Sequence, residues 1–130
     1  MPFDSASGEP LARFITQKNY VRPDNTVKHT PFMPSTKTWR LSVYKISGVS
    51  EAEIWSIGKT YVAEPLGKPI HGRADLSSFW VYDAGLSVQS VPEPHPLHAD
   101  IIGWDPASTA PRLQALKLAG KSAFRPLPAT

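Results

Sequence analysis

The sequence contains no cysteine. This absence excludes disulfide bonds, cysteine-ligated zinc sites and thiol nucleophiles, and it is compatible with either an oxidising or a reducing compartment. The sequence also lacks any apolar run of the roughly 18 residues that a membrane-spanning helix requires. The N-terminal segment carries an acid at Asp4 and no basic stretch followed by an apolar core, so it is not typical of a secretory signal. We therefore expect a cytoplasmic protein that does not enter the membrane.

Motifs of the common nucleotide-binding and hydrolase classes are absent as well. The chain has no G-x-x-x-x-G-K-[ST] phosphate loop, no G-x-G-x-x-G turn, no G-x-S-x-G elbow and no H-E-x-x-H helix. His95 and His98 are three residues apart, but Pro96 prevents a regular helix from presenting both to one metal ion. The sequence therefore predicts no metal site and no cofactor, and it leaves open whether the protein is an enzyme.

What is present indicates one folded domain. The 130 residues are 41% hydrophobic and 10% aromatic, which is enough apolar surface for a core without metal or disulfide staples. Fourteen prolines are about double the usual proportion, so short elements and many stiff connections are expected.

Charge is distributed unevenly along the chain. The net charge of +3 divides into +4 over residues 1–50, −5 over residues 51–105 and +4 over residues 106–130. Such basic ends could bind an anionic partner, or they could fold against the acidic middle and be neutralised there. We favour internal neutralisation.

Local patterns predict the elements. Trp39, Leu41 and Val43 alternate with polar residues, which indicates a strand over 38–46. Ser50 and Glu53 form the pattern of a capping box, so a helix should begin at Glu51 and end near Gly58. Further strands are expected at 60–63, 72–76, 86–91 and 98–104, the last two as an adjacent pair. Residues 11–16 would form a short strand or a helical turn.

A last helix is expected from Ser108 or Thr109 to about Ser122, with an apolar stripe formed by Leu113, Leu116 and Ala119 or Gly120. Together these elements predict an α+β fold, in which two short helices pack against a small antiparallel sheet in a single domain over 1–130. Within it, residues 1–35 should be an irregular N-terminal segment, residues 36–122 the core, and residues 123–130 a proline-bearing tail.

Two histidine-containing segments could carry chemistry, namely HGRAD at 71–75 and HPLH at 95–98. Histidine titrates near neutrality, and arginine binds phosphate in a planar fork. If the sheet brought them together, His71 or His98 could act as acid or base while Arg40 and Arg73 bound phosphate. A purely structural role is the competing interpretation: Arg73 would pair with Asp75, and His98 would bond to a neighbouring carbonyl group.

Aromatic and basic residues suggest a binding surface instead. The segment SSFWVYDAG is predicted to be a loop that carries Phe79, Trp80 and Tyr82, either as a lid over the core or as a recognition surface. The other tryptophans at 39, 55 and 104 are expected in the core. Basic residues on and after the last helix could neutralise phosphates; they are Arg112, Lys117, Lys121 and Arg125.

The segments FMPSTKTWRLSVYKISGVSEAEIW, GRADL and HADIIGW resemble those of an uncharacterised family of small bacterial proteins, over roughly residues 12–120. The resemblance implies a compact intracellular bacterial domain, of the kind found beside mobile or defence-related genes. It implies no activity and no site residues.

We therefore expect a non-catalytic interaction or accessory module of a multi-component bacterial system that binds a protein or a nucleic acid. The alternative hypothesis is a small enzyme that acts on a nucleotide or RNA through an arginine and histidine phosphate site.

Overall fold

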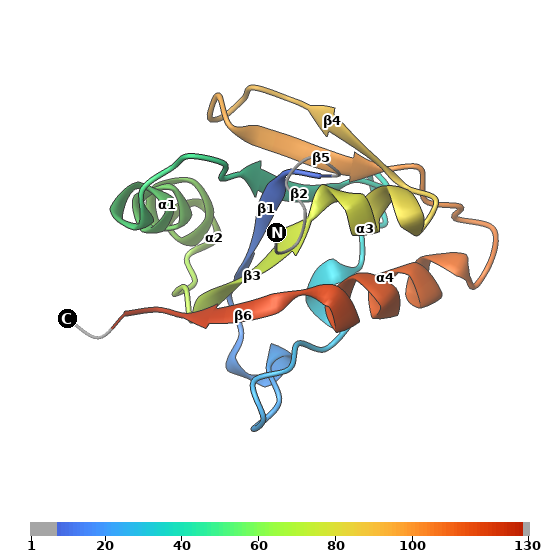
Figure 1. The fold of residues 1–130 in the computed structure, drawn as a ribbon, viewed down its shortest axis with the longest axis horizontal. Coiled ribbons are helices and arrows are strands. Elements are labelled where there is room, and N and C mark those ends of the chain that lie inside the picture. Colours follow the sequence, from blue (N-terminus) through green and yellow to red (C-terminus); the bar gives the residue numbers. More distant parts are fainter. Residues whose placement is uncertain (1–7, 129–130) are drawn as a thin grey trace.

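Within residues 8–128, which the computed structural model describes, six antiparallel strands form one sheet (Figure 1). The strands are β1 (Pro10–Ile15), β2 (Leu41–Lys45), β3 (Gly72–Ser77), β4 (Ser87–Ser90), β5 (His98–Ile102) and β6 (Ala123–Pro126). They lie in the order β4-β5-β2-β1-β3-β6. The predicted α+β class and the pairing of β4 with β5 are confirmed.

Strand β1 lies in the interior of the sheet, between β2 and β3. Leu11 and Ile15 belong to a large hydrophobic cluster on one face, and Ala12 and Phe14 belong to a smaller cluster on the other. Because both faces are buried, the strand lacks the alternation that marks a half-exposed strand. The expectation that residues 1–35 are irregular is therefore wrong for β1. Residues 123–126 of the expected tail likewise form the edge strand β6.

The first helical segment is longer than predicted. Helix α1 (Glu51–Ile57) begins as expected, because Ser50 Oγ accepts a hydrogen bond from the Glu53 amide at 3.2 Å. The helix then continues through a π-helical turn, η4 (Gly58–Ala63), and α2 (Glu64–Leu66), and it ends at Gly67 with φ of 65°. The predicted end at Gly58 and the predicted strand at 60–63 are both wrong.

Gly58 has a packing role instead of a terminating one. Its φ of −59° and ψ of −44° are ordinary helical values. A Cβ at this position would lie 2.5 Å from the Phe14 ring, which is closer than two carbon atoms can approach. The glycine therefore lets the helix lie directly on β1.

Helices α3 (Ser78–Asp83) and α4 (Ala110–Lys121) pack on the opposite face of the sheet, with the larger cluster between them and the strands (Figure 1). The segment predicted as an aromatic loop is thus helix α3, and the Ser77 hydroxyl caps it by accepting a hydrogen bond from the Phe79 amide at 3.1 Å.

Helix α4 packs against the core with a different side from the one that the positions of its leucines predicted. Leu113 and Leu116 are 63% and 40% exposed. The buried residues are Pro111, Ala115, Leu118 and Ala119. Small alanines at the contact allow the helix to approach the sheet closely. The predicted stripe is therefore wrong for Leu113 and Leu116 and confirmed for Ala119.

Of the three tryptophans expected in the core, one is buried there. Trp104 is buried in the larger cluster, whereas Trp39 and Trp55 are half-buried at the cluster margins. Trp39 has a φ of 55°, so the chain turns there and β2 begins later than the predicted strand at 38–46.

Ion pairs join the two basic ends of the chain to its acidic middle. They are Arg40 with Asp100 at 3.1 Å, Lys117 with Asp83 at 2.6 Å, and Arg125 with Asp75 at 3.6 Å. Internal neutralisation therefore accounts for part of the charge pattern. No helix in the described range 8–128 has the length and apolar character that crossing a membrane requires.

Candidate functional site

The four residues considered as a catalytic group do not meet in one cleft. Arg73 lies on β3 and His71 just before it, whereas His98 lies on β5 and Arg40 just before β2. Strands β2 and β1 separate β5 from β3. The predicted convergence is therefore wrong, and each residue has to be considered at its own location.

Arg73 is the centre of a structural network. The residue is only 2% exposed, its Nη atoms donate to both carboxylate oxygens of Glu51 at 2.9 Å, and its Nε donates to Asp75 at 2.9 Å. Its guanidinium group also lies 4.8 Å from the centre of the Trp55 ring. Burial lowers the pKa of Arg73, but the hydrogen bonds to the two carboxylates raise it by more, so it lies above its usual value. With its charge already matched, Arg73 fits the structural interpretation.

Arg40 also has a carboxylate partner, although its side chain is more exposed than that of Arg73. Its Nη1 donates to Asp100 at 3.1 Å and to Gln89 at 2.7 Å, across β5 and β4. Asp100 in turn lies beside His98, with 3.5 Å between Oδ1 and Nε2. Arg40 thus supports a polar cluster on β5, and its charge is paired with Asp100.

His98 contacts a serine that the sequence did not bring to attention. Ser42 Oγ of β2 lies against His98 Nε2, and His98 Nδ1 lies 2.9 Å from the carbonyl oxygen of Val91. The side chain of His98 is almost fully buried. The expected bond from His98 to a neighbouring carbonyl group is present, and it leaves the second ring nitrogen facing Ser42.

Arg13 is the cation that the sequence analysis missed. Strands β1 and β2 pair only at Leu11–Lys45 and Ala12–Tyr44. Beyond that point the Arg13 side chain bridges the two strands, since its Nη1 donates to the Ser42 carbonyl oxygen at 2.9 Å. Its Nε donates to the Pro31 carbonyl oxygen at 2.7 Å. Both partners are uncharged.

The partners of Arg13 distinguish it from the paired arginines of this protein. Among residues 8–128, no carboxylate lies within ion-pair distance of its guanidinium group, in contrast to Arg40, Arg73 and Arg125. Burial lowers the pKa of Arg13 to about 10, so the group still carries its charge at neutral pH. A half-buried cation held by two neutral carbonyl groups is suited to bind an anion.

Arg13 and Ser42 line the same pocket, which has a volume of about 260 Å³ and which we name the Arg13 pocket. Its other lining residues are aromatic or aliphatic: Phe14, Tyr44, Tyr61, Val62, Pro65, Leu66 and Pro94. Edge-to-face aromatic contacts order this wall. The ring centres of Tyr44 and His98 are 5.3 Å apart, and those of Tyr61 and His95 are 5.0 Å apart. Burial, and to a lesser degree Tyr61, raises the pKa of Tyr44, which therefore stays a neutral hydroxyl.

The sequence did contain a signal for this site. Arg13 is the single charge within the apolar run Leu11–Ile15, and a charge inside a strand buried on both faces needs a specific partner. The pocket itself could not be foreseen, because its walls come from β1, β2, the π-helical turn and residue 94.

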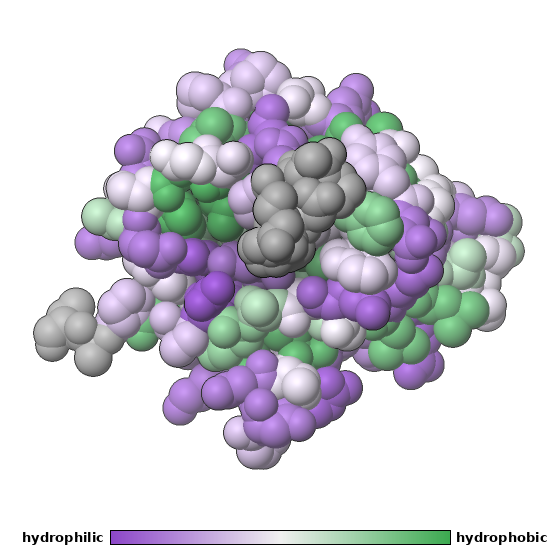
Figure 2. Space-filling view, viewed as in Figure 1, coloured by the Kyte–Doolittle hydropathy of each residue, from purple (hydrophilic) through white to green (hydrophobic). Residues whose placement is uncertain are grey.

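The predicted binding surface lies elsewhere, over α3 and α4. Phe79 and Tyr82 are 41% and 55% exposed, next to the exposed leucines of α4. Figure 2 shows apolar residues in green among polar ones over α4, at the right of the view. Trp80 is half-buried, and its ring centre lies 4.4 Å from Lys121 Nζ.

The basic residues of this surface are largely engaged within the molecule. Lys117 pairs with Asp83, Lys121 lies over Trp80, and Arg125 lies near Asp75. Arg112 is exposed on α4. Charges that already have partners within the fold contribute less to binding a polyanion.

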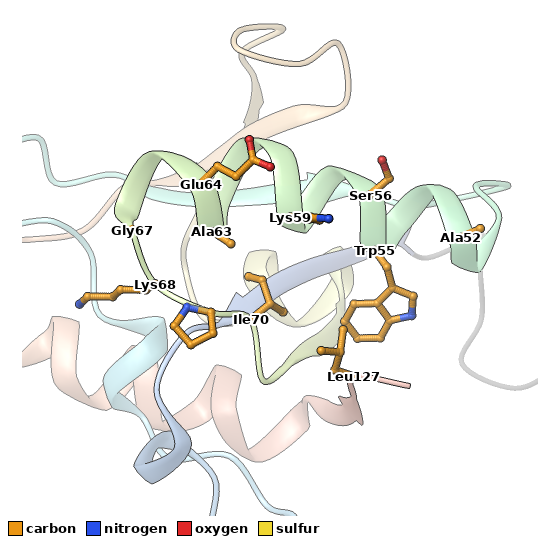
Figure 3. A pocket seen from close by; sticks show the side chains of 11 residues that line it. Ala52, Trp55, Ser56, Lys59, Ala63, Glu64, Gly67, Lys68, Ile70 and Leu127 are labelled. Atoms are coloured by element: carbon orange, nitrogen blue, oxygen red, sulfur yellow. The ribbon is translucent and has the colours of Figure 1, made fainter. Parts of the chain in front are cut away.

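An apolar groove of about 640 Å³ lies on the other side of the α1–α2 helix from the Arg13 pocket. Figure 3 shows Trp55, Ile70 and Leu127 facing the groove, whereas Ser56 and Glu64 point away from it. The groove therefore offers apolar contact and little polar chemistry. Across the described part of the chain, no three histidine or acidic side chains gather in a way that could hold a metal ion.

Neither a family model, nor a curated protein, nor a solved structure matches this chain.

Proposed function

We propose that the protein binds a small phosphate-bearing molecule in the Arg13 pocket. The observation that supports this proposal is the half-buried Arg13 guanidinium group, which lines a pocket and has no carboxylate partner among the described residues. Arginine binds phosphate oxygens through its planar fork, and it does so most strongly where water is partly excluded. The phosphate site expected from Arg40 and Arg73 is thereby reassigned to Arg13.

The rest of the pocket suits a phosphate ester better than a bare ion. Ser42 and Tyr61 bring hydroxyl groups to the same pocket, and Phe14 and Tyr44 supply apolar surface for an attached group. A volume of about 260 Å³ has room for a phosphate with part of its ester group. We therefore infer a ligand no larger than a mononucleotide.

The test is calorimetric titration of the full chain with inorganic phosphate and with adenosine monophosphate. We expect both to bind, the ester more tightly, and Arg13→Gln to weaken binding at least tenfold. Arg13→Lys keeps the charge without the fork and should retain part of the affinity. Binding should also disappear as the pH rises through the Arg13 pKa of about 10.

The matched control is Arg22→Gln. Arg22 is exposed and bonds to Thr26 and Val27, away from the Arg13 pocket. This variant should bind phosphate as the wild type does. Unchanged binding by a folded Arg13→Gln variant, or no binding by the wild type, would overturn the proposal.

A second candidate function is that of an accessory module of a multi-component bacterial system that docks a protein partner on α3 and α4. The exposed side chains of Phe79, Tyr82, Leu113 and Leu116 favour it. Lys117 pairs with Asp83 and Lys121 lies over Trp80, so both lysines are engaged in contacts between α4 and α3. A partner would cover the exposed apolar side chains of both helices.

This candidate is tested by cross-linking the tagged protein in its host and mapping the cross-links by mass spectrometry. A stoichiometric protein that survives nuclease treatment, cross-links to Lys117 or Lys121 and is lost in a Phe79→Glu, Leu113→Glu variant would support it. Recovery of the same partners by that variant would exclude docking at this surface.

A further inference from the structure

The hydrogen bond between Ser42 and His98 has a defined donor and a defined acceptor. His98 Nδ1 lies 2.9 Å from the carbonyl oxygen of Val91. A carbonyl oxygen can only accept, so Nδ1 must carry the proton. In the neutral ring Nε2 then holds the lone pair, and it faces Ser42 Oγ. The serine hydroxyl is therefore the donor and His98 the acceptor.

Two further residues are placed to stabilise the ring once it gains a proton. Asp100 Oδ1 lies 3.5 Å from the same Nε2. Arg40 holds the other carboxylate oxygen of Asp100 at 3.1 Å. A carboxylate at this position can interact with the imidazolium that forms when His98 takes a proton, and an arginine that fixes the carboxylate keeps it in position. A nucleophile, a base and a group that orients the base are the parts that nucleophilic catalysis requires.

Ser42 is also accessible to a ligand. Ser42 lines the Arg13 pocket, and its own carbonyl oxygen accepts the hydrogen bond from Arg13 Nη1 at 2.9 Å. Ser42 lies on the same side of the sheet as His98, and the Arg13 guanidinium group reaches the Ser42 carbonyl oxygen from between β1 and β2, beyond their last paired residues. An anionic group held by Arg13 would lie close to Ser42 Oγ.

We propose that Ser42 is the nucleophile and His98 the general base of a phosphoryl-transfer reaction on a small phosphate monoester. This inference rests on the proposed function, because Arg13 has to hold the phosphoryl group.

The reaction would proceed in two steps. In the first, Ser42 Oγ attacks phosphorus while His98 Nε2 takes the hydroxyl proton, and the bond between phosphorus and the ester oxygen breaks. The leaving oxygen receives the electron pair and then the proton from His98, which gives a free alcohol and phosphoserine. In the second, water attacks phosphorus with His98 again as base, and the proton returns to Ser42 as phosphate leaves.

The experiment measures nitrophenolate release from p-nitrophenyl phosphate together with the affinities for phosphate and vanadate. Vanadate mimics the five-coordinate transition state, so the wild type should bind it at least about a hundredfold more tightly than phosphate. Ser42→Ala and His98→Gln should lower turnover by about a hundredfold or more. Ser42→Ala should also lose the preference for vanadate, because its affinity for vanadate should fall by more than its affinity for phosphate.

The control is Ser87→Ala, which removes an exposed serine from β4 of the same sheet. It should leave both turnover and vanadate affinity unchanged. Wild-type protein that binds phosphate but shows neither turnover nor a preference for vanadate would overturn the Ser42–His98 proposal alone. Wild-type protein that does not bind phosphate would overturn both this inference and the proposed function.

Discussion

At the scale of single residues, the arginines show that the same side chain can be structural or functional according to its partners. Arg73 has two carboxylates and an aromatic ring around it, so its charge is matched within the fold. Within residues 8–128, the hydrogen-bond partners of Arg13 are two carbonyl oxygens. A buried charge without an internal counterpart is costly for folding, and a site that keeps one has a reason outside the fold, which we take to be ligand binding.

The Arg73 network predicts a specific sensitivity to acid. Hydrogen bonding from Arg73, more than any other contact, holds the pKa of Glu51 below its usual 4.5. A carboxyl group with a lowered folded-state pKa stabilises the fold above its unfolded pKa, and this contribution is lost as the pH falls through the folded-state value. Glu51→Gln should therefore lower the unfolding free energy at pH 7, and the difference from wild type should vanish in acid. Urea unfolding of the wild type and the variant, from pH 7 down into acid, measures this difference in unfolding free energy.

The control for this prediction is Glu53→Gln. Glu53 lies in the same turn of α1, and it forms no ion pair within the described range of the chain. Its substitution should have a smaller effect that changes less with pH. The same pH profile in both variants would show that the Arg73–Glu51 pair adds nothing to stability.

At the scale of elements, two helical glycines have opposite roles. Gly58 packs against Phe14, where an added Cβ would lie 2.5 Å from the ring, whereas nothing lies within 4 Å of a Cβ added at Gly120 in α4. Helix propensity alone would make alanine stabilising at both positions, by roughly 0.5–1 kcal/mol.

We therefore expect the same substitution to have opposite signs. Gly120→Ala should stabilise the protein by roughly 0.5–1 kcal/mol. Gly58→Ala should destabilise it by about 1–3 kcal/mol, since overpacking has to move Phe14 or the helix. Thermal unfolding of the two variants beside wild type tests this, and a stabilising Gly58→Ala would mean that the contact with Phe14 is loose.

At the scale of the whole molecule, the order of strands makes the two ends of the chain unequal. β1 lies between two strands and supplies side chains to both hydrophobic clusters, whereas β6 lies at one edge of the sheet and pairs only with β3. Removing an inner strand leaves two unpaired edges and opens both clusters.

Truncations should reveal this difference. Deletion of residues 1–15 should abolish cooperative unfolding, measured by near-ultraviolet circular dichroism. Deletion of residues 123–130 should lower the melting temperature but keep a cooperative transition, because it exposes one edge and the surface under Phe124. A cooperative transition after the first deletion would mean that β1 is dispensable.

The candidate site was only partly accessible from sequence. His98 and its bond to a carbonyl group could be anticipated, because a histidine at the start of a buried strand needs a partner. Ser42 was one of the polar residues that alternate with apolar ones in the predicted strand over 38–46. It becomes informative only when β5 places His98 beside it and Arg13 bonds to its carbonyl oxygen.

The sequence by itself determined the α+β class, the cap at Ser50, the pairing of β4 with β5 and the burial of Trp104, since these follow from local patterns and short connections. The tertiary structure alone decided the inner position of β1, the continuation of the helix past Gly58 and the outward side of α4. It also decided which arginine has no carboxylate partner within residues 8–128. These features depend on contacts between residues distant in the chain, and a local pattern carries no information about which distant residue will contact a given position.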